Sequence, residues 1–529
     1  MERWKRLYDR ILLSRARNHQ PSALSVYFDD NKAREGLSRQ SLRSGAFSLA
    51  SRGLNVVIQL VSTIVLARLL LPEDFGLFAM ISALTGFAPA LIDLGTSDAA
   101  VQKSRITHDE ISALFWLNAA IGGVLTVAIV ICAPLIASFY HESRLEKITQ
   151  VWALIFTLSA LSTQHLALLR RALMFQKIGM IEVGANLAGA GGAIGMALAG
   201  YGYWALVFRP MLTAFLTLLG VGLSCRWVPK LPRYSNGVRE MLTFGIHITA
   251  FTTIDYFGRA LDRVALGYTS GARSLGYYQN ACLVYENPLA IVGVPLHTVA
   301  VATLSKLRNN VDELRQYWST ALSSLCFFAM PAFVILAVTG SDVVVLVLGE
   351  KWFYAGTLLS VIALRGPAHV VERTQGWLHV AAGRTDRWMR WGIVSCCGQV
   401  IALFCGLPFG TMGIATAYTI YAYFLFVPAI VYSGVPFGIG ASQLLRAVGP
   451  QLTGSVCAAM IGFVLRFEYL GDAPMMIRIT ILVLVCVGVY LLVTVGLFKT
   501  VKPLQVARSL AVEFLPARLS GLLPARFMN

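Results

Sequence analysis

Apolar stretches of roughly 20 residues follow one another along most of the chain, with polar segments between them. A helix needs about 20 mostly apolar residues to cross the hydrocarbon core of a bilayer. The pattern therefore predicts an all-α, polytopic membrane protein with about 14 transmembrane helices. The predicted spans are 46–70, 75–97, 111–137, 149–167, 181–199, 202–223, 241–262, 277–303, 316–340, 357–380, 391–407, 412–433, 449–466 and 477–498.

Lysine and arginine are concentrated in every second gap between the predicted spans. These gaps and the two ends of the chain contain about 31 basic residues, against about 5 in the remaining gaps. Because cytoplasmic segments of membrane proteins are enriched in Lys and Arg, both termini are predicted to be cytoplasmic. The loops on the other side are short, the longest at roughly 341–356, so no extracytoplasmic domain is expected there.

An internal repeat divides the chain into two related halves. Residues 75–78 (FGLF) align without a gap with 275–278 (LGYY), and the same offset pairs Gly45 with Gly245. Such self-similarity is typical of transporters with two pseudo-symmetric lobes. We predict a basic N-terminal arm, a six-helix N-lobe, a linker, a six-helix C-lobe, an extra helix pair and an amphipathic tail, at 1–45, 46–223, 224–240, 241–433, 449–498 and 499–529.

Composition excludes an ordinary soluble domain. The 529 residues are 56% hydrophobic and 13% charged, whereas soluble proteins carry about a quarter charged residues. The net charge of +17 is explained by topology signals, so no nucleic-acid partner is predicted. The nine cysteines show no metal-ligand spacing. Neither a metal site, a cofactor nor a disulfide framework is predicted.

Charged residues interrupt several of the apolar spans, where each costs several kcal/mol, from about 2.5 upward, unless it is paired or hydrated. We expect them to face an aqueous cavity between the lobes, or each other. The arginines form the candidate substrate-binding set, and the carboxylates form the candidate ion-coupling set. These sets are Arg52, Arg209, Arg259, Arg365 and Arg373, and Asp93, Asp255, Glu286 and Glu372.

Simpler interpretations exist for some of these charges. Asp255 and Arg259 are four residues apart, so a local ion pair on one helix face is an alternative to a functional role. Arg466 and Arg478 lie near predicted helix ends, where snorkelling to the interface explains them. Arg52, Arg259 and Arg365 are the deepest in their spans and the hardest to explain in this way.

The chemistry of these residues suits a phosphate-bearing substrate. The planar guanidinium donates bidentate hydrogen bonds to phosphate oxygens and remains charged when dehydrated. Carboxylates in the same cavity could bind a coupling cation or a proton. The aromatic residues Tyr256, Phe257, Tyr285 and Trp377 could stack on sugar rings, although aromatic residues in helices more often pack.

The segment GAFSLASRGLNVVIQLVSTIVLARLLLPEDFGLFAM (45–80) resembles the first two helices of the polysaccharide transporter family. These are the Wzx-type flippases of the MOP superfamily, and the chain looks most like the colanic-acid/exopolysaccharide branch. The resemblance extends from about residue 40 to 500 and includes Ala67, Arg68, Leu70, Pro72, Asp74, Phe75 and Gly76, and the run Gly383–Asp386.

The resemblance implies a non-enzymatic protein of the bacterial inner membrane that moves undecaprenyl-diphosphate-linked oligosaccharide units to the periplasmic leaflet. Such units serve exopolysaccharide, capsule or O-antigen synthesis. Alternating access around a cationic cavity is the implied mechanism, driven by an H⁺ or Na⁺ gradient or the membrane potential. Membrane lipids and other polysaccharide assembly proteins are the implied partners, and no catalytic residues are expected.

Two other function classes are consistent with a polytopic membrane protein. A drug or cation antiporter of the same superfamily favours a cavity dominated by carboxylates, whereas arginine is prominent in these spans. A membrane polysaccharide polymerase or ligase is expected to need a sizeable outward loop with catalytic arginines or histidines. The predicted outward loops are all short, so the flippase is the leading hypothesis.

Overall fold

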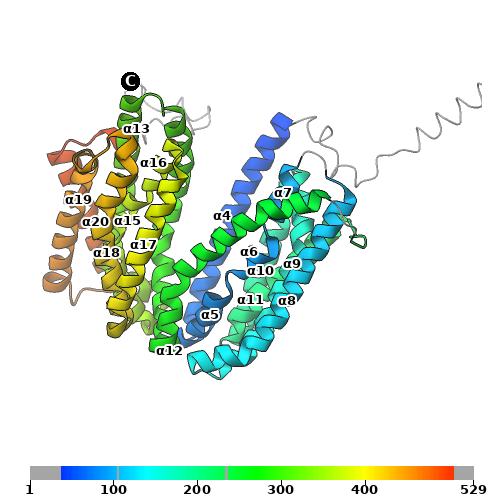
Figure 1. The fold of residues 1–529 in the computed structure, drawn as a ribbon. Coiled ribbons are helices and arrows are strands. Elements are labelled where there is room, and N and C mark those ends of the chain that lie inside the picture. Colours follow the sequence, from blue (N-terminus) through cyan, green and yellow to red (C-terminus); the bar gives the residue numbers. More distant parts are fainter. Residues whose placement is uncertain (1–36, 104–105, 233–235, 506–529) are drawn as a thin grey trace, which may run out of the picture. The chain divides into compact units, whose positions relative to one another are not determined.

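The computed structural model describes residues 37–103, 106–232 and 236–505, and helices make up nearly all of them (Figure 1). Within these residues, 10 helical segments are long and apolar enough to cross a membrane. The all-α polytopic fold is therefore confirmed, whereas the count of 14 spans stays a prediction. The chain forms two compact units, Met1–Val264 and Ala265–Asn529.

The first unit packs its long helices closely wherever glycine faces a neighbouring backbone. A Cβ at Gly122 would meet the Phe156 carbonyl of the next helix, and one at Gly189 would meet the Arg209 carbonyl. Small residues at such positions let transmembrane helices approach each other. The helices are α4 (Leu37–Leu69), α5 (Pro72–Thr85), α6 (Ala88–Asp93), α7 (Thr96–Gln102), α8 (His108–Tyr140), α9 (Arg144–Arg171), α10 (Phe175–Leu198), α11 (Trp204–Cys225) and the first part of α12 (Asn236–Lys306).

The second predicted span is broken into α5, α6 and α7 rather than continuous. Pro89 lies in the first turn of α6, where its missing N–H costs no intrahelical hydrogen bond. Leu94 and Gly95 are both left-handed, with φ of 46° and 65°, and they separate α6 from α7. The break gives unit 1 two interior helix ends, which polar side chains satisfy as described below.

The seventh and eighth predicted spans are joined in α12, which is interrupted at Gly271 (φ 74°, ψ 178°). Leu71, at the equivalent position of the first half, is the extended residue that precedes α5. The part of α12 that ends at Val264 belongs to unit 1 and packs on its other helices. There the Tyr256 hydroxyl donates to the Ser82 carbonyl at 2.5 Å.

The second unit contains the rest of α12 and eight further α-helices. The ninth predicted span, 316–340, is longer than expected, because α13 continues to Leu348 through residues assigned to the outward loop 341–356. A short 3₁₀ segment at Leu407–Phe409, which includes Pro408, connects α17 to α18. The helices are α13 (Val311–Leu348), α14 (Phe353–Leu364), α15 (Gly366–Arg373), α16 (Gln375–Ala382), α17 (Thr385–Gly406), α18 (Gly410–Gly434), α19 (Ala441–Val464) and α20 (Met475–Leu491).

The extra helix pair, α19 and α20, shares a core with α13. Buried side chains from all three helices form one cluster that includes Phe327, Val338, Ala458, Leu482 and Tyr490. The pair ends in π-helical segments at Leu465–Tyr469 and Leu492–Leu497. The last helices are therefore an integral part of unit 2.

Candidate functional site

The candidate site of unit 2 lies at a break in the tenth predicted span of the chain, 357–380. Arg365 separates α14 from α15, and Pro367 follows in the first turn of α15. Proline has no N–H and its ring collides with the carbonyl four residues earlier, so the α-helical ladder stops there. Side chains of α18 accommodate the break: Tyr423 donates to the Leu364 carbonyl at 2.9 Å, and Thr419 donates to the Val361 carbonyl at 3.2 Å.

Arg365 extends from this break onto an aromatic surface inside the unit. Its guanidinium carbon lies 4.8 Å from the centre of the Tyr285 ring and 6.0 Å from that of Tyr418. Its Nε lies 3.4 Å from the Tyr285 hydroxyl. A guanidinium stacked on aromatic rings keeps its charge while losing part of its hydration.

Tyr285 links the arginine to His369 and is itself held firmly. The tyrosine is 1% exposed, and its hydroxyl lies 2.7 Å from His369 Nδ1. The Tyr285 and His369 rings are nearly parallel, at 7°. Phe333 also packs against the Tyr285 ring, with 5.2 Å between the ring centres. This hydrogen bond satisfies one ring nitrogen of His369 inside the unit.

Arg365 forms no ion pair with a carboxylate in the part of the chain that the structure describes. Its close contacts are therefore aromatic faces and a hydroxyl, and no carboxylate among the described residues lies within ion-pair distance of it. A cation held in this way can accept an anionic ligand without first breaking a salt bridge.

Two of the other predicted site residues of unit 2, Glu372 and Arg373, lie near Arg365 in sequence, and Glu286 lies next to Tyr285 on α12. Glu372 follows Arg365 by two helical turns, and its side chain is partly exposed. Arg373 and, on α12, Glu286 are exposed. Adjacent Glu372 and Arg373 point to different helix faces, as expected from their spacing.

Unit 1 contains the remaining candidates. Arg52 on α4 and Arg259 on α12 are exposed, and Arg209 on α11 is half-buried. The side chain of Asp255 lies outside the described residues, so the predicted pairing of Asp255 with Arg259 stays a prediction. The assignment of these residues to one cavity between the lobes also stays a prediction.

Asp93 has a structural partner that the sequence did not reveal. Its Oδ1 accepts the Ser97 N–H at 2.9 Å, at the start of α7. Beside it, the Thr96 hydroxyl donates to the Asp93 carbonyl at 2.6 Å. Thr96 in turn accepts from Gln164 at 3.0 Å and from Asn118 at 3.2 Å. Asp93 therefore helps to satisfy the broken helix.

Two of the four predicted sugar-stacking residues are buried, whereas Tyr256 is partly exposed and Phe257 is 44% exposed. Trp377 is 2% exposed and Tyr285 is 1% exposed. Tyr256 binds the Ser82 carbonyl, and Phe257 packs on Phe87 at 5.1 Å. Of the four, Tyr285 alone contacts a candidate arginine through a described contact.

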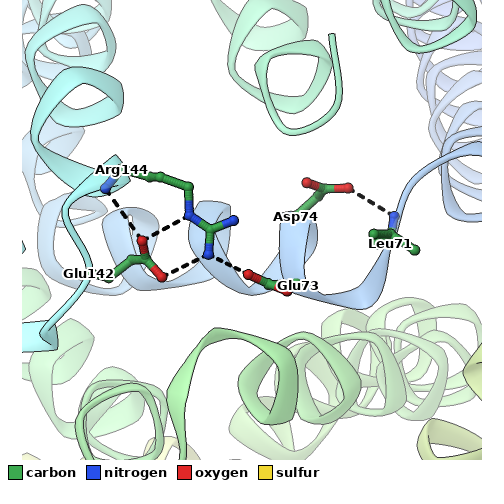
Figure 2. Close-up of polar contacts among 5 residues, drawn as sticks. All are labelled: Leu71, Glu73, Asp74, Glu142 and Arg144. Carbon is green, nitrogen blue, oxygen red and sulfur yellow. Dashed lines mark hydrogen bonds and ion pairs between the residues drawn. The ribbon is translucent and has the colours of Figure 1, made fainter. Parts of the chain in front are cut away.

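A second polar network joins helix ends of unit 1 (Figure 2). The Arg144 guanidinium pairs with Glu142 at 2.8 Å and also with Glu73 of α5. The next residue, Asp74, accepts the Leu71 N–H at 2.9 Å, which stabilises the start of α5. The motif that carries the family resemblance thus includes a helix cap at Asp74.

Comparison with known proteins agrees with this architecture. The family model described as polysaccharide biosynthesis protein matches residues 65–355. The lipopolysaccharide biosynthesis protein WzxC of Escherichia coli is 28% identical over 437 residues, covering 81% of this chain and 80% of that protein. The teichuronic acid biosynthesis protein TuaB of Bacillus subtilis is 24% identical over 391 residues, covering 71% and 78%.

A solved structure shares the fold. The lipid II flippase MurJ, in an inward closed conformation, superposes with a TM-score of 0.65 at 16% identity. The match covers 87% of this chain and 99% of MurJ. The two-unit helical architecture is therefore that of a known membrane transporter fold.

Proposed function

The chain belongs to the polysaccharide biosynthesis protein family, and on this premise we propose that it is a flippase for lipid-linked oligosaccharides. It moves undecaprenyl-diphosphate-linked repeat units across the bacterial inner membrane for exopolysaccharide, capsule or O-antigen assembly. Two kinds of observation support the proposal: the fold shared with MurJ, and relatives whose names refer to lipopolysaccharide and teichuronic acid biosynthesis.

Arg365 is the structural observation that carries the proposal. It lies between α14 and α15, at a break in the tenth predicted span, stacks on Tyr285, and forms no ion pair with a carboxylate among the described residues. A diphosphate is a strong acceptor for such a group, because guanidinium–phosphate contacts are bidentate and charge-assisted. We assign Arg365 to the diphosphate of the lipid carrier. Arg52, Arg209, Arg259 and Arg373 complete the proposed cationic path.

Alternating access of the two units would expose this path to each side of the membrane in turn. The coupling ion would be H⁺ or Na⁺, with Glu286 and Glu372 as the carboxylates of unit 2, and Asp93 and Asp255 as those of unit 1. Both termini would lie in the cytoplasm. Asp93 is the weakest of these candidates, since its carboxylate already accepts a backbone N–H.

The two alternative classes have less support. An antiporter for organic cations needs uncompensated carboxylates, whereas the described interior site of unit 2 centres on an arginine. A polymerase or ligase needs a large outward loop. The loop predicted at 341–356 is instead mostly helical, with α13 ending at Leu348 and α14 beginning at Phe353.

The decisive experiment locates the substrate after deletion of the gene. We expect lipid-linked repeat units to accumulate on the cytoplasmic face, where a periplasmic ligase or glycan-modifying probe does not reach them. Units that reach the periplasm unpolymerised would contradict the flippase and favour a polymerase. Complementation with Arg365→Ala should fail at wild-type protein level, whereas Arg446→Ala, an exposed arginine of α19, should restore export.

A further inference from the structure

Side chains from α16, α17 and α18 of unit 2 form a compact aromatic and basic cluster, which does not include Arg365. Three planar groups contact Tyr432 of α18. The Trp391 ring stacks on it at 5.3 Å and 26°, the Arg387 guanidinium carbon lies 4.6 Å from the ring centre, and the His379 ring lies at 6.0 Å. Trp388 adds a fourth plane by stacking on His379 at 6.3 Å and 9°.

This cluster contains several buried nitrogen atoms without a hydrogen-bond partner among the described residues. They are Arg387 Nε, Trp391 Nε1 and His379 Nε2. His379 is 1% exposed and Trp391 is 8% exposed. Arg387 makes one internal hydrogen bond, from Nη2 to the Tyr432 carbonyl at 2.7 Å. Arg387 Nε and Trp391 Nε1 are N–H donors. Buried donors are costly when unpaired, so two donors beside one ring indicate an acceptor-rich ligand.

The charge around the cluster identifies the ligand as an anion. Arg384 and Arg390 lie one turn on either side of Arg387 and are exposed. The Arg308 guanidinium lies against Gly383, at the turn that leads into α17. None of these four arginines forms an ion pair within the described chain. Their field therefore favours phosphate over a neutral sugar.

The surroundings indicate that this phosphate belongs to a lipid. Next to the cluster, α17 presents Met389, Ile393 and Val394, which are 65%, 58% and 58% exposed. Met389 and Ile393 are one turn apart, so they form an apolar stripe that leads away from the arginines along the helix. A headgroup at the helix end and a chain along this stripe match the form of a membrane lipid.

We infer that Arg387, Trp391 and His379 form a binding site for the phosphate group of a membrane lipid. The ligand is either an anionic phospholipid or a polyprenyl diphosphate, which share the same acceptor chemistry. This inference goes beyond the proposed function, because lipid binding at this place requires no transport. It gives a role to the Gly383–Asp386 turn, which the transport site in unit 2 does not use.

The site can be tested with the full-length protein by native mass spectrometry. The probes are phosphatidylglycerol, undecaprenyl diphosphate, and a diacylglycerol that lacks phosphate. We expect Arg387→Gln to weaken binding of the phosphate lipids about tenfold, as loss of a charge-assisted donor predicts. Trp391→Phe keeps the ring against Tyr432 but removes the N–H, and should weaken binding in the same direction. Arg446→Gln, an exposed charge on α19, should leave binding unchanged.

The outcomes separate the two ligand sources. Variant-sensitive binding of undecaprenyl diphosphate alone would identify the carrier lipid, and equal binding of both phosphate lipids would show that the site recognises phosphate itself. Variant-sensitive binding of phosphatidylglycerol alone would identify a structural phospholipid. The inference is overturned if diacylglycerol binds as well as phosphatidylglycerol, or if neither Arg387→Gln nor Trp391→Phe weakens binding. Either result is independent of whether the protein transports oligosaccharides.

Discussion

The carboxylate of Asp342 on α13 binds the guanidinium of Arg478 on α20, with 2.5 Å between Oδ1 and Nη2. The other carboxylate oxygen lies 3.0 Å from Arg466 Nη2, at the end of the helix that precedes α20. Asp342 is 4% exposed. The snorkelling predicted for Arg466 and Arg478 is therefore wrong, because both arginines turn inward to a shared carboxylate that the sequence pattern placed in a loop.

Removal of this carboxylate should destabilise the helix pair. Asp342→Ala leaves two partly buried guanidinium groups without a counter-charge, and breaking a buried ion pair in this way costs about 3–5 kcal/mol. We expect a lower unfolding temperature in detergent and faster proteolysis near Gly471. The control is Asp312→Ala, because the Asp312 side chain is 92% exposed in its pair with Arg315 and such surface pairs contribute about 0–1 kcal/mol. Equal stability of the two variants would show that the ion pairs of Asp342 with Arg466 and Arg478 do not anchor the helix pair α19 and α20.

Tyr285→Phe should impair transport while the protein remains folded. The change removes the hydroxyl that lies beside Arg365 Nε and His369 Nδ1 but preserves the ring under the guanidinium. A neutral hydrogen bond contributes about 0.5–1.5 kcal/mol, so export should fall by roughly two- to tenfold. Tyr354→Phe is a matched control, because it also removes one hydroxyl bond, to Thr411 at 2.9 Å. Equal export by the two variants would show that Tyr285 contributes packing and no functional hydrogen bond.

The pH dependence of stability should report on the network in Figure 2. Hydrogen bonds and charge attraction from Arg144 hold the pKa of the Glu142 carboxyl below its usual range. A carboxyl whose pKa is lower in the folded state stabilises the fold above its unfolded-state pKa, and this stabilisation disappears as the pH falls through the folded-state value.

We therefore expect the unfolding temperature to fall as the pH is lowered from about 5 to 3, with a smaller fall in Glu142→Gln. The two proteins should converge at the acid end of this range. Arg144→Gln removes the cause of the shift and should give the same flattened profile. A wild-type slope in both variants would assign the acid sensitivity to other carboxyl groups.

The sequence predicted the helical class, and it marked Arg365 as a candidate site residue, for identifiable reasons. The length of an apolar segment alone indicates a membrane helix. Arg365 was predicted as a candidate because charged residues are rare in such a segment. Its environment was not predictable, because Tyr285 comes from another helix and is brought there by tertiary packing. The breaks at Leu94 and Arg365 were also missed, since a hydropathy pattern averages over residues and does not detect local proline and glycine geometry.

The absence of a side chain at Gly366 sets the position of the break beside Arg365. A Cβ at Gly366 would overlap the ring of Phe333 on α13, and Phe333 is fully buried. Gly366→Ala should therefore shift α15 away from α13 and destabilise unit 2 by about 1–3 kcal/mol. Since Arg365 precedes this glycine, export should fall with stability. Phe333→Leu in the same chain should return part of both, because it removes ring atoms at the contact. If the second substitution only adds to the defect, the steric origin of the effect is excluded.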